Sequence, residues 1–127
     1  MPRVSAAFFT FGALCVLPGM VLGMQMGATE DFRLAAAHAH INLVGWVTMA
    51  LYGTFYALTS ATMSARLAWT NFAVSVAGLL LMIPPLILLL LGNKNYIGPM
   101  VAGEMLTAVG LVIFLISVLR ELFRKRA

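Results

Sequence analysis

The chain has 127 residues, of which 62% are hydrophobic and only 9% are charged. Its mean hydropathy of +1.00 excludes an ordinary water-soluble domain and is typical of an integral membrane protein. The net charge of +4 does not indicate nucleic-acid binding, because the cations stand at the ends and in the links, where they mark membrane topology. The single cysteine, Cys15, excludes an internal disulfide.

Four apolar segments predict spanning helices over about 5–26, 32–58, 69–91 and 100–119, followed by a basic tail, 120–127. The first segment is long enough to span and lacks a clean cleavage motif, so we expect a spanning helix rather than a secretory signal peptide. We expect Thr29 or Asp31 to cap the second helix, and Pro84-Pro85 to kink or break the third.

Short links between these helices predict an all-α fold with one transmembrane domain, 1–127, built as an up-down-up-down four-helix bundle. Small residues are expected to let the helices approach closely, namely Gly45, Gly53, Gly78 and Gly110. Two cations, Arg33 and Lys94, fall on one side of the predicted bundle. The other side carries Arg3, Arg66, Arg120, Arg124, Lys125 and Arg126. The positive-inside rule therefore predicts cytoplasmic termini and places both histidines in the outer half of the membrane.

The two histidines, His38 and His40, stand near the start of the second predicted helix. Ionisable groups inside a spanning helix are candidates for function. Two positions differ by about 200° around an α-helix, so the two imidazoles point to nearly opposite faces and cannot share one ion or one haem. Asn42, Gly45, Met49, Tyr52 and Tyr56 are predicted on the His38 side. A flat macrocycle could rest against Gly45, and Arg33 could pair with its propionates.

The pattern around these histidines resembles a haem-binding helix in subunit I of the haem–copper oxidase and nitric oxide reductase superfamily. The resemblance lies within residues 33–56 and is carried by Arg33, His38-Ala39-His40, Asn42-Leu43, Gly45-Trp46, Tyr52-Gly53 and Tyr56. In that superfamily, subunit I consists of three similar arcs of four helices, and one His-x-His serves two haems. The resemblance implies that this chain corresponds to one arc in a bacterial inner (plasma) membrane.

By the same resemblance, three copies would rebuild the ring as a homotrimer, and each haem b would bind His38 of one copy and His40 of the next. The implied role is electron transfer with a redox partner protein, or redox or gas sensing. The chain has neither the copper-site histidine cluster of the oxidases nor the tyrosine cross-linked to it, so a complete oxygen reductase is not expected.

Two alternatives remain at this stage. The histidines could hydrogen-bond across helices in a structural or assembly subunit of a respiratory complex. Imidazole and thioether groups could instead bind copper, using Met20, Met24, Met26, Met100 and Met105. Glu104 is the one carboxylate predicted inside a span; it and Tyr52 could orient a histidine or carry a proton, or Glu104 could simply reach water.

Overall fold

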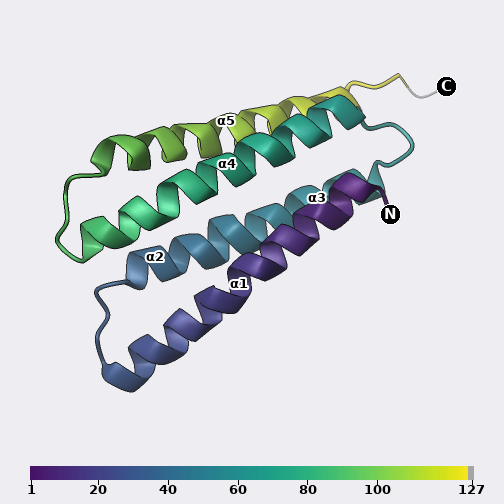
Figure 1. The fold of residues 1–127 in the computed structure, drawn as a ribbon. Coiled ribbons are helices and arrows are strands. Elements are labelled where there is room, and N and C mark those ends of the chain that lie inside the picture. Colours follow the sequence, from purple (N-terminus) through teal and green to yellow (C-terminus); the bar gives the residue numbers. More distant parts are fainter. Residues whose placement is uncertain (126–127) are drawn as a thin grey trace.

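The computed structural model describes residues 1–125, in which every regular element is helical (Figure 1). The first long helix is α1 (Arg3–Thr29), and the second consists of α2 (Ala35–His40), the π-helical segment η1 (Ile41–Thr48) and α3 (Met49–Leu58). The third and fourth are α4 (Ala65–Leu90) and α5 (Ile97–Leu122). The all-α prediction is confirmed. Arg126 of the predicted basic tail lies outside the described residues.

Successive long helices run in opposite directions, so that both termini lie at the same end of the molecule (Figure 1). We call this the terminal end; it also contains the link 59–64. The opposite end, which we call the histidine end, contains the links 30–34 and 91–96. All four long helices are long and apolar enough to cross a membrane. Apolar side chains such as Leu80 and Leu111 are 63% and 56% exposed, as expected for surfaces that face lipid.

The helix ends differ from the predicted ones for local reasons. The α4 helix begins at Ala65 rather than near residue 69, because the Ser64 hydroxyl oxygen caps it by accepting from the Leu67 N–H at 3.4 Å. The α5 helix begins at Ile97. Pro99 is tolerated in its first turn, because N–H groups there have no helical partner and proline lacks an N–H. The predicted cap of the second helix is wrong: its N-cap residue is Leu34, which makes no side-chain cap bond.

Proline lies beyond the first turn in two of the long helices. The prolines Pro84-Pro85 were predicted to kink or break this helix, and the break is contradicted, because α4 continues through both prolines to Leu90. Each proline still removes one i to i−4 hydrogen bond. Pro85 and Met82 are buried, so packing holds this part of α4 in place. The α1 helix likewise continues through Pro18.

The helices pair as two hairpins, α1 with the composite second helix and α4 with α5 (Figure 1). In the α4–α5 hairpin, a Cβ at Gly103 would stand 2.7 Å from the Gly78 carbonyl oxygen and 2.8 Å from the Met82 Cα. Gly110, Gly45 and Gly53 are also buried against neighbouring helices. The prediction that glycines allow close helix approach is confirmed.

Aromatic rings join the two hairpins near the terminal end. Phe8 of α1 contacts Tyr52, Tyr56 and Phe72, with ring centroids between 5.2 and 5.8 Å apart. The Tyr52 ring lies 4.5 Å from that of Phe114 on α5. Edge and offset contacts of this kind add to the free energy gained by packing. The core therefore fastens α3 to α5 on the terminal side of the histidines.

Candidate functional site

The π-helical segment η1 begins one residue after His40 and changes which residues share a face of the second helix. A π-helix has more residues per turn than an α-helix, and such segments occur frequently at functional sites. The Thr48 hydroxyl donates to the Leu43 carbonyl, five residues back, at 2.9 Å. Tyr52, predicted on the His38 side, contacts Phe8 of α1 on that side and also lines a groove together with His40.

The His38 imidazole is half-buried between the second helix and α1. Its Nδ1 lies 2.8 Å from the Gly19 carbonyl oxygen, and since a carbonyl only accepts, Nδ1 is the protonated nitrogen. A Cβ at Gly23 would stand 2.7 Å from the His38 Cε1, so a larger residue there would displace the ring from this position. This contact fits the alternative prediction of a histidine that hydrogen-bonds across helices.

Two residues expected near a macrocycle, Asn42 and Gly45, instead face α1. The Asn42 Nδ2 lies 3.3 Å from the His38 Nε2, to which it can donate. Its Oδ1 is buried and has no hydrogen-bond partner among the described residues. Gly45 is buried against Cys15, whose Cβ would lie 3.0 Å from a Cβ at Gly45. Neither residue lines the groove that contains His40.

The His40 imidazole turns to the other side of the second helix, as predicted for opposed faces. Its Nδ1 donates to the Ala36 carbonyl of its own helix at 2.7 Å. The ring lines a groove of about 360 Å³ between the second helix and α5, and Glu104 stands on the α5 side of that groove. Val44, Met82 and Leu111 supply apolar wall. His40 and Glu104 thus share one groove, whereas His38 does not line it.

Arg33, expected to pair with haem propionates, forms an ion pair with Asp31 in the link before α2. The Arg33 Nη2 lies 2.8 Å from the Asp31 Oδ2, and the Arg33 backbone N–H also donates to Asp31 Oδ1 at 3.2 Å. The side-chain hydrogen bond from Arg33 holds the pKa of Asp31 below its usual value. Both side chains are solvent-exposed at the histidine end, so Arg33 can exchange this partner for another anion at small cost.

The five methionines proposed as copper ligands are divided between the interior and the outer surface. Met26 and Met100 are buried. The thioethers of the other three point outward, with exposed fractions of 56% for Met20, 65% for Met24 and 62% for Met105. These outward thioethers, two on α1 and one on α5, fit lipid-facing packing, the ordinary role of methionine at such positions.

A buried chain of polar side chains near the terminal end was not predicted. The Tyr56 hydroxyl lies 3.1 Å from the Ser117 Oγ and accepts from the Asn71 Nδ2 at 3.2 Å, while the Ser75 hydroxyl donates to the Asn71 Oδ1 at 3.0 Å. All four side chains are buried. The sequence does carry a signal for it, because Asn71 and Ser75 stand four residues apart in a mostly apolar helix.

Comparison of this chain with family models, with curated proteins and with solved structures finds no match. The features that bear on function are therefore those of the chain itself. They are a multi-pass helical fold and two imidazoles on opposite sides of one helix. In both rings, Nδ1 donates to a backbone carbonyl oxygen. The His40 ring also shares a groove with the Glu104 carboxylate.

Proposed function

We propose that this chain is a haem b-binding membrane protein that takes part in electron transfer or in redox or gas sensing. The observation that carries the proposal is that His38 and His40 both donate Nδ1–H to backbone carbonyls. Each ring then has Nε2 as its unprotonated nitrogen, the arrangement typical of histidines that bind metals. When bound, haem supplies an iron centre that can take up and release one electron.

The residues around His40 fit such a group. An apolar wall with small side chains, such as Thr107 and Ala108, suits a flat macrocycle, and the groove opens to one side of the chain. The Glu104 carboxylate could accept a proton there or orient a neighbouring ligand. The exposed Arg33 guanidinium at the histidine end suits a propionate.

Since the two imidazoles diverge, one copy would give one ligand to each of two sites. We therefore propose that copies assemble side by side, three being favoured by the resemblance of residues 33–56, with haem between His38 of one copy and His40 of the next. At His38 the iron would take the place of the Asn42 amide, which is 3.3 Å from Nε2. The basic residues at the terminal end favour cytoplasmic termini in a bacterial inner membrane.

The test is an absorption spectrum of the purified protein from haem-supplied cells, oxidised and then reduced. We expect the sharp reduced bands of a six-coordinate b-type haem, unmoved by carbon monoxide for an electron carrier and shifted for a gas sensor. His38→Ala and His40→Ala should each remove all haem, because every site needs both ligands, whereas Asn95→Ala in the link 91–96 should remove none. A colourless wild-type protein would contradict the proposal of haem binding. Single variants that each keep half of the haem would contradict the proposal of a site shared between two copies.

A structural role is the second candidate, because His38 hydrogen-bonds to the Gly19 carbonyl across helices. In that case the protein would be a non-catalytic subunit of a respiratory complex, and His38→Ala would lower stability without any spectral change. Metal analysis of the same sample separates both candidates from a copper protein.

A further inference from the structure

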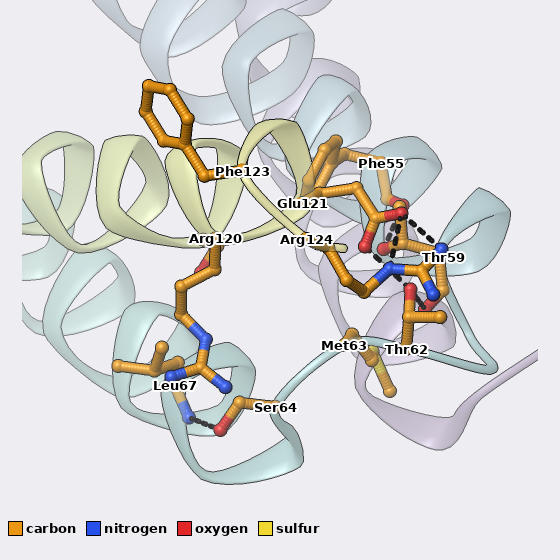
Figure 2. A pocket seen from close by; sticks show the side chains of 11 residues that line it. Phe55, Thr59, Thr62, Met63, Ser64, Leu67, Arg120, Glu121, Phe123 and Arg124 are labelled. Carbon is orange, nitrogen blue, oxygen red and sulfur yellow. Dashed lines mark hydrogen bonds and ion pairs between the residues drawn. The ribbon is translucent and has the colours of Figure 1, made fainter. Parts of the chain in front are cut away.

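A second cavity, far from the histidines, opens at the terminal end of the molecule (Figure 2). It has a volume of about 330 Å³ and lies between the link 59–64, the first turn of α4 and the last turns of α5. Hydroxyl groups, two arginines and several apolar side chains line it together. With these cationic and hydroxyl groups, the cavity can bind a polar group.

The charged side chains that line this cavity, two arginines and one glutamate, carry a net positive charge. Glu121 is engaged by Arg124, whose Nη2 lies 3.0 Å from its Oε1, and by the Thr62 hydroxyl, which donates to its Oε2 at 2.7 Å. Arg120 extends instead toward Ser64 and the start of α4 (Figure 2). Within residues 1–125, no carboxylate pairs with the Arg120 guanidinium, which leaves its positive charge for a ligand.

Hydrogen-bond donors converge on the same space as that guanidinium. The Ser64 oxygen accepts from the Leu67 N–H, so its own hydroxyl proton remains for another acceptor. Ser64 also stands at the N-terminus of the long α4 helix, where first-turn N–H groups lack helical partners and the helix dipole favours an anion. The donors and the guanidinium together suit an oxyanion with several acceptor oxygens.

The remaining wall of the cavity is apolar and reaches the outer surface of the bundle. Phe55, Met63 and Leu67 line it together with Phe123, which is 76% exposed. The neighbouring Leu122 is 69% exposed at the end of α5, where a spanning helix meets the membrane boundary. A ligand here would therefore meet cationic groups on one side and apolar side chains on the other.

We propose that this cavity binds the phosphate group of an anionic phospholipid in the leaflet at the terminal end. Basic pockets between spanning helices at a membrane face are suited to such headgroups. The Arg120 guanidinium and the Ser64 hydroxyl hold the phosphate oxygens, and the apolar wall contacts the glycerol and upper acyl region. The site is separate from the histidines and does not depend on haem binding.

The experiment is native mass spectrometry of the full chain released from micelles with equal amounts of phosphatidylglycerol and phosphatidylcholine. The wild type should retain phosphatidylglycerol preferentially, and Arg120→Gln should lower that preference about five-fold, as expected for one basic side chain at an anionic surface. Arg3→Gln is the matched control, because Arg3 lies at the same end but does not line the cavity. Far-UV circular dichroism establishes that each variant is folded.

Three outcomes would overturn the proposal. The first is equal retention of the two lipids by the wild type. The second is an equal effect of Arg3→Gln and Arg120→Gln, which would mean diffuse attraction to the whole basic end. The third is displacement of the lipid by inorganic phosphate but not by chloride at equal ionic strength, which would assign the cavity to free phosphate.

Discussion

The two hairpins of this protein both depend on glycine, but they use it in different ways. In the α4–α5 hairpin, Gly78 and Gly103 bring one helix backbone directly against the other. In the first hairpin, glycines of α1 instead leave room for side chains of the second helix: Gly12 for Trp46, Gly19 for Asn42 and Gly23 for His38. The helices of the α4–α5 hairpin thus pack backbone against backbone, whereas the glycines of α1 leave space that the side chains of Trp46, Asn42 and His38 occupy.

This difference predicts that glycine substitutions have unequal effects in the two hairpins. Gly103→Ala should be the most damaging, because its Cβ would meet backbone atoms of α4 that can move only with the whole helix. We expect a loss of about 2–3 kcal/mol in the free energy of unfolding, typical of overpacking. Unfolding in mixed detergent micelles measures it. Gly98→Ala in the first turn of α5 is the control, since nothing lies near its Cβ position.

The matching change in the first hairpin, Gly23→Ala, should cost less but alter the candidate site. The added Cβ meets the His38 ring, which can rotate away at an off-rotamer cost of about 0.5–1.5 kcal/mol. If the proposed haem site is correct, the reduced absorption bands should also weaken. Gly27→Ala on the same helix is the control, as its Cβ position is open. Equal stability losses for Gly23→Ala and Gly103→Ala would contradict the proposal that glycine has a different role in each hairpin.

Tyr56→Phe tests the polar link between the hairpins. The variant loses the hydroxyl that contacts Ser117 and accepts from Asn71, while the ring contacts remain. We expect a loss of about 0.6–1 kcal/mol in the free energy of unfolding, as found for hydrogen bonds between spanning helices. Tyr96→Phe, at an exposed position, should leave stability unchanged. No loss in Tyr56→Phe would mean that the aromatic contacts alone join α3 to α5.

The smallest effect is expected outside the hairpins, at the Arg33–Asp31 pair. Because Arg33 lowers the pKa of Asp31 in the folded state, the pair stabilises the fold above the unfolded pKa of Asp31, and this is lost as pH falls through the lower folded value. Arg33→Gln removes the side-chain hydrogen bond but keeps the backbone N–H donor at position 33, so the Asp31 pKa should rise toward its ordinary value. Carboxyl NMR titration measures this, with Glu30→Gln as the control. An Asp31 pKa unchanged by Arg33→Gln would exclude the pair as the cause.

The sequence was sufficient for the helices and for the divergence of the two imidazoles, because both follow from hydropathy and α-helical spacing. It was not sufficient for the partners of those imidazoles. The carbonyl of Gly19 that accepts from His38 carries no sequence signal, since every residue has a carbonyl. The place of Tyr52 in the groove that contains His40 also carries no sequence signal, because a π-helical segment changes the angle per residue without a distinctive composition.

The chain of buried hydrogen bonds at Tyr56 was missed for a different reason. Asn71 and Ser75 lie in a segment so apolar that hydropathy alone does not reveal them. Tyr56, which joins Asn71 to Ser117, is distant from both in the sequence. Pairing of such groups depends on which helices are neighbours, and helix order in space is not encoded by local spacing.

The π-helical segment also has a mechanical consequence. It is a torsional joint between an end of the second helix that carries His40 and an end fixed by Tyr52 and Tyr56 against α5. A local change between π-helical and α-helical winding would rotate one end relative to the other, because the two helices turn by different angles per residue. His40 could therefore swing within its groove while the aromatic anchor stays still, so motion at the candidate site need not disturb the bundle.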